Sequence, residues 1–491
     1  MAEAEAFDRI GADWDPDWLL TDAQKELRAQ LIEICNTTLH PNAIEFDKTY
    51  EYPRRNMEAL ASLGLLALHV PKKYGGLGEN HVCVAMVLET IGRYGCPSTA
   101  LVYTMHLLSV SALLFRAEGN PEIEAVLRRL NDDVFIGTAS YSDPETGSHF
   151  WYPMASKAEK TDDGWRVHKK SSWTTSGGFA DFYVAQTSSP DFNGDFANLS
   201  VFLVMKDEIV TGESNWSAMG MRGNQSGPIE INGVEVNKHR MVGFPGDGAT
   251  SNDEALDPIG LTMFAASYNG IALAAMDIAK GQTTRKVHKD VGMRVADYPT
   301  IQDYVGECLM DTEASRLYTF GVAQALDQAT DNCDWTRHGR EPDWTPRTNL
   351  LHWTWMSKFI SCKNVYNVLD KMLQACGGSG YKTSLGLERL LRDGKAGWVM
   401  GPTNEVLRQF VGKAALLGMD SLDYWNQVPN EGVLNNELKK LDEDAKRDLI
   451  LGLFEAECVR FGEFTLASGK QSPIYVDLRR VISYPDLFQQ V

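Results

Sequence analysis

The chain has 491 residues, of which 43% are hydrophobic and 23% are charged, values typical of a globular protein. One hydrophobic core rarely supports a chain of this length, so we expect roughly two to four domains. The 47 Lys and Arg residues face 66 Asp and Glu residues, which gives a net charge of −19. This charge disfavours nucleic acid and acidic lipid surfaces as partners, because both require a basic footprint.

The sequence also bears on location and on the use of cysteine. The apolar stretches fall short of the roughly 18 residues that a membrane helix needs, and the acidic N-terminus lacks the features of a signal peptide. The eight cysteines include no C-x-x-C pair. We therefore expect a cytoplasmic protein with reduced, packed thiols, no membrane span and no metal site.

Residues 1–133 are expected to form an N-terminal helical domain. Apolar residues recur there at helical spacing, and Pro41 predicts a break in the first helical stretch. The segment 81–131 predicts two further helices, divided near Gly95 and Pro97.

The composition changes at about residue 134, and residues 134–250 predict a central β domain. Gly, Ser, Thr, Asn and Asp become frequent, and the apolar runs become short. Strands are predicted at Phe182–Ala185, Leu199–Met205 and Ile229–Val236. Within the last of these, the pair Asn232–Gly233 is typical of a hairpin turn.

Helical periodicity returns after residue 258, and residues 251–425 predict a bundle of three or four long helices. The charged residues 426–448 predict a linker, and residues 449–491 predict the beginning of another globular unit. The order of helices, strands and again helices favours an α+β fold over a doubly wound parallel sheet.

Three segments carry the residue types that a cofactor needs. Ser140–Ser148 and Lys170–Gly178 combine glycine, hydroxyl groups and an indole, which could bind an anion or a planar ring. Gln374–Tyr381 ends a helical stretch with glycines that would let a pyrophosphate approach. Taken alone, each is equally typical of a surface turn, a core tryptophan or a helix C-cap. P-loop and dinucleotide-binding patterns are absent from the sequence.

Taken together, these segments resemble the acyl-CoA dehydrogenase superfamily of flavoproteins over about residues 20–420. Five segments carry the resemblance, namely Pro71–Gly78 (P-x-x-Y-G-G-x-G), Ser142–Ser148 (T-E-P-x-x-G-S), Trp173–Gly177 (W-I-T-N-G), Met219–Ser226 (M-G-x-R) and Gln374–Asp393 (Q-x-x-G-G-x-G…R-D). The resemblance implies a helical N-terminal domain, a β-barrel-like middle domain, a C-terminal four-helix bundle and FAD as the cofactor.

The resemblance also implies which residues hold FAD. Tyr141 and Ser142 would lie along the pyrimidine edge, Ser148 would reach the pyrophosphate, Trp173 would cover the isoalloxazine and Thr175 would bond near N5. Further contacts are implied for Arg285, Gln302, Gln374, Gly377, Gly378, Thr403 and Glu405. Because Arg285, Gln374, Gly377 and Gly378 would serve a neighbouring subunit, a homodimer or homotetramer is expected.

The sequence departs from the family at the catalytic base. The family's usual carboxylate falls on Gly401, and glycine cannot transfer a proton. A second position that some members use falls on Gly260. Glu254 and Asp257 lie close by and are candidate bases, although an acid there could equally stabilise a helix end.

Three functions therefore stay open. The first is a dehydrogenase with a displaced base, which would oxidise a CoA or carrier-protein thioester and pass electrons to an acceptor protein. The second is a flavin-dependent monooxygenase of the N- or S-hydroxylating type, supplied by a flavin reductase. The third is a non-catalytic scaffold subunit.

The end of the chain has a second resemblance. Phe461–Arg479 resembles the N-terminal segment of orotate phosphoribosyltransferase, and Lys470 matches a loop lysine of that family. Because the sequence stops at Val491, before that family's diphosphate-binding strand, we expect no complete transferase site.

Overall fold

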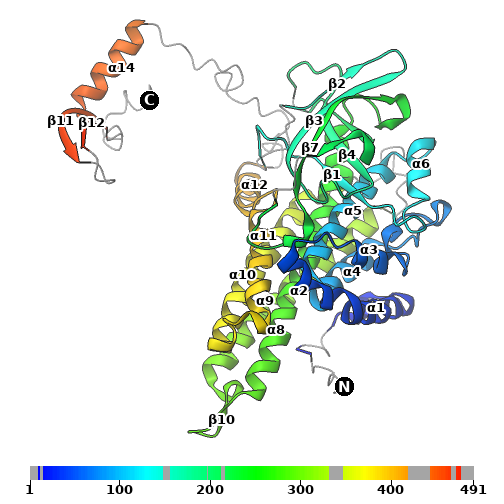
Figure 1. Cartoon of the computed structure of the whole chain (residues 1–491), viewed down its shortest axis with the longest axis vertical. Helices are drawn as coiled ribbons and strands as arrows, with labels where there is room; N and C mark the ends of the chain where they lie inside the picture. The colour runs from blue at the N-terminus through cyan, green and yellow to red at the C-terminus, as the bar shows by residue number, and fades with distance from the viewer. Residues whose placement is uncertain are drawn as a thin grey trace. The chain divides into compact units, whose positions relative to one another are not determined.

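The computed structural model describes residues 9–10, 15–147, 155–195, 197–211, 216–330, 347–418, 443–465 and 471–476. The chain divides into two compact units, Met1–Asn426 and Gln427–Val491. The first unit holds every residue of the predicted flavin site, and its ribbon is shown in Figure 1. Ser148, Cys333 and Lys470 lie outside the described residues.

The N-terminal helices begin with a nearly continuous rod. Helix α1 (Asp22–Ile34) starts at a capping box, in which the Thr21 hydroxyl accepts a hydrogen bond from the Gln24 N–H at 3.2 Å. A π-helical turn joins α1 to α2 (His40–Thr49). The break expected at Pro41 is therefore wrong: this proline lies in the first turn of α2, directly after the wider π turn, where its missing N–H is tolerated.

Four further helices complete the N-terminal region, namely α3 (Arg54–Ala61), α4 (His81–Tyr94), α5 (Pro97–Phe115) and α6 (Pro121–Leu127). The predicted division between α4 and α5 is confirmed. Gly95 follows the last residue of α4, and Pro97 occupies the first turn of α5, where its fixed φ suits a helix start.

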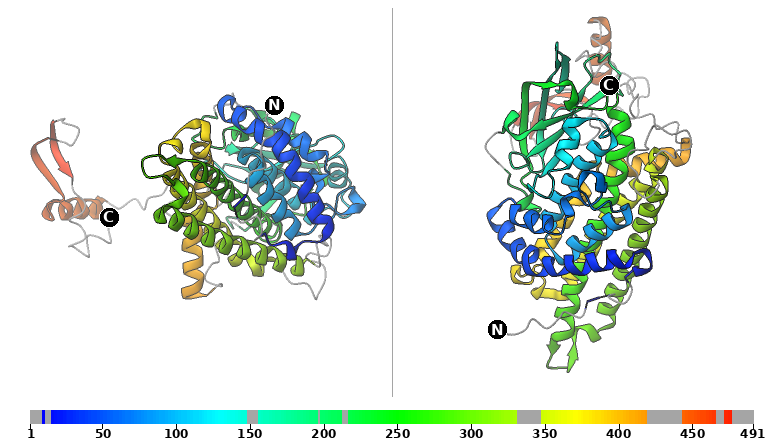
Figure 2. Two further views of the ribbon diagram at one scale, coloured as in Figure 1. Left: turned by 90° about the horizontal axis from the view of Figure 1, so that it is seen from below. Right: turned by 90° about the vertical axis from the view of Figure 1, so that its right-hand side faces the viewer.

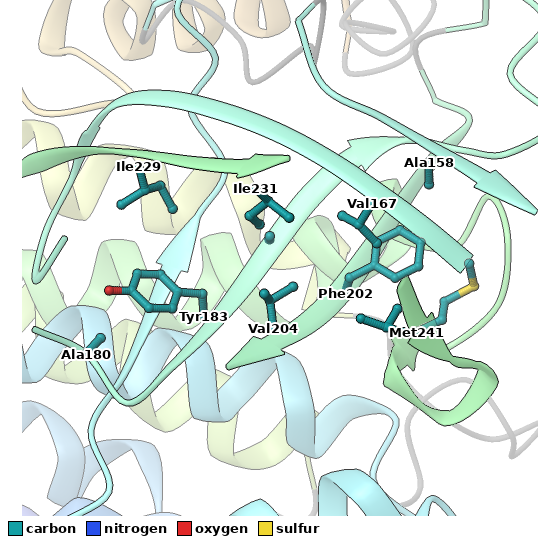
Figure 3. Close-up of a cluster of buried hydrophobic side chains, with 11 residues drawn as sticks. Ala158, Val167, Ala180, Tyr183, Phe202, Val204, Ile229, Ile231 and Met241 are labelled. Carbon is teal, nitrogen blue, oxygen red and sulfur yellow. The ribbon is translucent and has the colours of Figure 1, made fainter. Parts of the chain in front are cut away.

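The middle of the unit is an eight-stranded, mostly antiparallel sheet. Its strands are β1 (Gly137–Ser140), β2 (Lys157–Lys160), β3 (Gly164–Thr174), β4 (Phe182–Ser188), β5 (Leu199–Met205), β6 (Val210–Thr211), β7 (Gly227–Asn237) and β8 (Met241–Val242). Their order is β6-β7-β3-β2-β4-β5-β8, and β1 pairs with β4 in parallel. The three predicted strands are confirmed as β4, β5 and β7. One face buries a cluster that includes Tyr183, Phe202 and Ile231 (Figure 3).

The hairpin predicted at Asn232–Gly233 is wrong, because β7 continues through this pair. Val167 of β3 pairs with Val234, and the next residue, His168, pairs with Asn232. Gly233 is thus an extra residue in the ladder, and its φ of +68° is a conformation that glycine adopts readily. The Asn-Gly pair makes a β-bulge instead of a turn.

The C-terminal bundle begins earlier than its periodicity predicted. The short α7 (Gly248–Ser251) and a π turn (Asn252–Leu256) lead into α8 (Asp257–Arg285). The remaining helices are α9 (Pro299–Ala329), α10 (Leu351–Cys376), α11 (Leu387–Val399) and α12 (Asn404–Leu417). A small hairpin, β9 (Val287–His288) and β10 (Met293–Arg294), joins α8 to α9 at the end of the bundle away from the sheet (Figures 1 and 2).

Two helices correct the expectation that no apolar stretch approaches membrane length. Pro97–Phe115 and Gly248–Arg285 are long and apolar enough to span a bilayer, by length and composition alone. Within the fold, 94% and 100% of their most apolar windows are buried. Each is therefore packed as a core helix.

The second unit contains α14 (Glu443–Glu455) and an antiparallel hairpin of β11 (Val459–Thr465) and β12 (Gln471–Val476). Ala456 and Cys458 are its buried residues in the described part. Its likeness to orotate phosphoribosyltransferase stays a prediction. Over the whole described chain seven cysteines are free and buried, as expected for packed thiols.

Helix α11 connects the bundle to the β domain and to α2 through contacts of its side chains. The Arg392 guanidinium donates to both carboxylate oxygens of Asp47, at 2.7 and 2.6 Å. The neighbouring Asp393 accepts a 2.6 Å hydrogen bond from the Met221 N–H. Gly220 lies so close that an added Cβ would stand 2.3 Å from the Arg392 carbonyl oxygen. The M-G-x-R and R-D motifs therefore meet at one domain junction.

We expect Gly220→Ala to lower the free energy of unfolding by about 1–3 kcal/mol, since the new methyl group overlaps the Arg392 carbonyl. Chemical denaturation of the holoenzyme measures this change. Gly321→Ala in α9 is the control: no atom lies within 4 Å of its added Cβ, and alanine should be neutral or slightly stabilising in a helix. Equal stability of the Gly220 variant and the native chain would contradict this close junction.

Candidate functional site

Four of the predicted flavin residues meet where β1 and β3 end. Tyr141 and Ser142 follow the last residue of β1, while Trp173 and Thr175 lie at the end of β3. The Thr138 hydroxyl donates to the Thr175 carbonyl oxygen at 2.8 Å. The Ser142 hydroxyl lies 3.0 Å from that of Ser171, which precedes Trp173 by two residues. The structure thus brings the two motifs side by side.

This junction has the chemistry to hold a planar ring. The Trp173 side chain is 69% exposed and meets Trp216 edge to face, with ring centroids 5.4 Å apart. The hydroxyl groups of Thr175 and Ser226 lie 3.1 Å from each other. An exposed indole beside hydroxyl donors fits a ring that is apolar on its face and polar on its edge. The residues present therefore fit the isoalloxazine of FAD.

The sequence analysis missed a buried lysine behind this junction. Lys169 of β3 is fully buried, and its Nζ donates to the carbonyl oxygens of Ser142 at 2.7 Å and Tyr141 at 3.3 Å. Burial lowers the pKa of Lys169 to about 8, and the nearby charge of Asp143 opposes that shift. The alternation of β3 could have revealed this lysine, because Val167 and Ser171 on the same side are also buried.

The loop that carries Gly401 is fastened by another buried lysine. Lys358 of α10 donates to the carbonyl oxygen of Pro402 and to the side chain of Asn404, both at 3.0 Å. Thr403 caps α12, and its hydroxyl accepts from the Val406 N–H at 3.4 Å. This loop therefore has a fixed conformation without a carboxylate at position 401.

Glu405 lies in the first turn of α12. Its Oε1 accepts a 2.7 Å hydrogen bond from the Trp398 indole, and this bond lowers the pKa of the Glu405 carboxyl. Thr403 and Glu405 lie at the start of α12. This helix packs against the first residues of α10, where Trp355 contacts Phe410 of α12.

The other predicted flavin residues lie at the opposite end of the bundle. Arg285 is the last residue of α8, and Gln302 lies in the first turn of α9. Gln374, Gly377 and Gly378 lie at the end of α10. An ion pair between Lys371 and Glu307 joins the α10 and α9 parts of this end. All five residues are exposed, and no atom lies within 4 Å of a Cβ added to either glycine.

A single chain does not bring the predicted flavin residues near the ends of β1 and β3 together with those at the opposite end of the bundle. Helix α8 has 29 residues between Asp257 and Arg285, which is roughly 43 Å at about 1.5 Å per residue. The residues near the ends of β1 and β3 lie at the Asp257 end of α8. The residues at the ends of α8 and α10 lie at its Arg285 end. The expectation that the residues at the Arg285 end serve a neighbouring subunit stays a prediction.

The two candidate bases have different surroundings. Glu254 is buried and accepts hydrogen bonds from the Arg347 N–H at 2.9 Å, the Thr348 N–H at 3.2 Å and the Thr348 hydroxyl. These donors begin the helical turn Arg347–Leu350 before α10. Glu254 therefore stabilises a helix start, which was the structural alternative for this acid.

Asp257 is half-buried at the start of α8. Burial and the nearby charge of Asp253 raise the pKa of Asp257 well above its usual range. Burial raises the pKa of the Tyr141 phenol, a hydrogen bond with Ser251 opposes that shift, and the nearby charge of Asp257 adds to it. A basic carboxylate thus lies near one of the predicted flavin residues.

The position that some family members use for the base is closed here. A Cβ added to Gly260 would stand 2.5 Å from Cδ2 of Leu108 on α5. A carboxylate side chain at this position would require the Leu108 side chain to move. Within the described residues no group of three or more side chains is arranged to hold a metal ion.

Comparisons with known proteins agree with this architecture. Residues 21–128 match the family model "Acyl-CoA dehydrogenase, N-terminal domain", and residues 262–416 match "Acyl-CoA dehydrogenase, C-terminal domain". The two matches together cover more than half of the chain.

Two curated proteins and one solved structure illustrate the likeness. A probable acyl-CoA dehydrogenase, FadE25 of Mycobacterium tuberculosis, is 27% identical over 400 residues, which are 81% of this chain and 96% of that protein. Cyclohex-1-ene-1-carbonyl-CoA dehydrogenase of Geobacter metallireducens is 28% identical over 401 residues, 81% of this chain and 99% of that protein. The structure of glutaryl-coenzyme A dehydrogenase with glutaryl-CoA has a TM-score of 0.73 at 21% identity, and covers 81% of this chain and 96% of that one.

We expect Trp173→Ala to weaken FAD binding about tenfold, because an aromatic contact contributes about 1 kcal/mol beyond the area that it buries. Equilibrium titration of the apoprotein with FAD, followed by flavin fluorescence, measures the change. Trp18→Ala is the control, since Trp18 is 72% exposed in a different part of the fold. The same FAD affinity in both variants would refute the placement of the ring at Trp173.

Proposed function

The chain belongs to the acyl-CoA dehydrogenase family of FAD-dependent oxidoreductases, and on that premise we propose that it dehydrogenates an acyl thioester with Asp257 as the base. The observation that carries this assignment is the half-buried Asp257, whose pKa is raised and whose charge acts on the pKa of the predicted flavin residue Tyr141. Bound FAD supplies the hydride acceptor.

The position of Asp257 supports its role as a displaced base. Residues three apart lie on one face of a helix, so Asp257 shares a face with Gly260, about 4.5 Å further along the axis. The raised pKa makes its carboxylate a stronger base than an exposed aspartate. Asp257 would take the α-proton that the family's usual carboxylate takes.

The residues around FAD have positioning roles in this proposal. Ser142 and Thr175 would offer hydroxyl and N–H donors to the edge of the ring, Trp173 would cover the ring, and Tyr141, near Asp257, would lie along the pyrimidine edge with Ser142. Thr403 and Glu405 approach from α12. Arg285, Gln302, Gln374, Gly377 and Gly378 would hold the dinucleotide end of a neighbouring subunit's FAD, and a homodimer or homotetramer follows from that sharing.

The named relatives favour the dehydrogenase over the two alternatives. Both curated relatives are named as CoA dehydrogenases, which supports a CoA thioester substrate. The electrons would then pass to an acceptor protein. The monooxygenase would need no base, so a basic Asp257 beside Tyr141 would have no part in it. A scaffold would need neither Asp257 nor an exposed Trp173.

An anaerobic titration of the purified holoenzyme with a panel of acyl-CoA thioesters tests the activity. Loss of the flavin absorbance at about 450 nm is expected on addition of the correct thioester, because the hydride reduces the ring. An unchanged spectrum with every thioester would contradict the dehydrogenase assignment. Substrate-dependent oxygen consumption with reduced flavin would then identify the monooxygenase.

We expect Asp257→Asn to slow flavin reduction by about 10²–10⁴-fold, the usual contribution of a general base, with FAD content unchanged. Anaerobic stopped-flow absorbance measures the rate. Asp253→Asn is the companion variant: loss of the Asp253 charge lowers the pKa of Asp257, so the acid limb of the pH–rate profile should move to lower pH. A native rate in Asp257→Asn would exclude this residue as the base.

A further inference from the structure

Lys169 is a buried cation that the proposed reaction does not use. It lies in β3, paired with Ile231 of β7, and its side chain is fully buried. Its two partners are the carbonyl oxygens of Ser142, at 2.7 Å, and Tyr141, at 3.3 Å. Burial of an ammonium group costs free energy unless the group is well paired. A functional role would explain why Lys169 is buried here.

The negatively charged group near Lys169 is Asp143, and its carboxylate also accepts hydrogen bonds from other groups. Asp143 acts on Lys169 electrostatically, but its carboxylate also accepts hydrogen bonds from the Ala155 N–H at 3.1 Å and from the Ser156 hydroxyl at 2.9 Å. Its charge is therefore shared among several donors. Lys169 is the charged group that hydrogen-bonds directly to the two carbonyl oxygens of this segment.

The partners of Lys169 are peptide groups of the segment that the family resemblance assigns to the pyrimidine edge of FAD. A trans peptide holds its C=O and its N–H on opposite sides of one rigid plane. The carbonyl of Tyr141 belongs to the same peptide as the Ser142 N–H, and the carbonyl of Ser142 belongs to the same peptide as the Asp143 N–H. A cation bound to each carbonyl fixes the plane and polarises the N–H on the far side.

Hydride transfer to FAD adds two electrons and one proton, which leaves one negative charge on the pyrimidine edge of the ring. We propose that Lys169 is a positioning residue that favours this reduced, anionic form of FAD by orienting and polarising the two peptide groups between Tyr141 and Asp143. The inference rests on the proposed placement of FAD beside Ser142. The charge acts through the backbone, so Lys169 itself need not touch the cofactor.

The two-electron potential of the holoenzyme tests this role. Lys169→Met removes the charge and keeps an unbranched side chain. We expect its preference for reduced over oxidised FAD to fall at least tenfold, which is about 30 mV for a two-electron couple. Equilibration with a reference dye during enzymatic reduction measures the potential. Lys170→Met is the matched control: this neighbour is 58% exposed, lies 3.5 Å from Glu230 and should leave the potential unchanged.

A native potential in Lys169→Met would overturn the proposal. If that variant loses FAD or does not fold, Lys169→Gln keeps a donor for the carbonyls without the charge; a lowered potential supports the proposal, and a native potential overturns it. If neither variant holds FAD, the spectrum of the reduced native holoenzyme at pH 6 decides: anionic reduced flavin supports the proposal, and neutral reduced flavin overturns it. None of these measurements needs a thioester, so a failure of the proposed dehydrogenase activity is seen separately.

Discussion

The hydrogen bond from the Met221 N–H of the β domain to Asp393 of α11 is the contact on which the site depends. The residues proposed to hold the ring come from the sheet, and the proposed base comes from the bundle, so their spacing is set by the junction between these domains. Arg392 binds both carboxylate oxygens of Asp47, and the adjacent Asp393 accepts from the Met221 N–H. A bidentate pair of this kind fixes orientation as well as distance. Gly220 lets the backbones of the β domain and α11 approach closely enough for the hydrogen bond between Met221 and Asp393 to form.

Local patterns of the sequence predicted the order of domains, and the family resemblance implied the meeting of the Ser142 and Trp173 motifs. Other features depend on contacts between distant residues. Gly233 is a bulge because of its register against β3, and Pro41 continues a helix because a π turn precedes it. Lys169 was missed because a lysine in a strand of mixed polarity gives no sign of which carbonyls it will meet.

The different roles of Glu254 and Asp257 also could not be predicted from the local sequence. They are three residues apart in sequence and were equivalent as candidate bases. The fold separates them, because the N–H groups of Arg347 and Thr348 reach Glu254 across more than ninety positions of sequence and occupy its carboxylate. Asp257 instead faces another acid, Asp253, and keeps its basicity. The distinction comes from partners that no local pattern specifies.

The separation of the flavin residues along α8 has a thermodynamic consequence. If the Arg285 end of one subunit completes the site of another, cofactor binding and subunit association are one linked equilibrium. Dilution of the protein would then release FAD, and excess FAD would draw subunits together. The concentration of assembled protein, and with it the supply of cofactor, would govern how much of the chain is competent for redox chemistry at any moment.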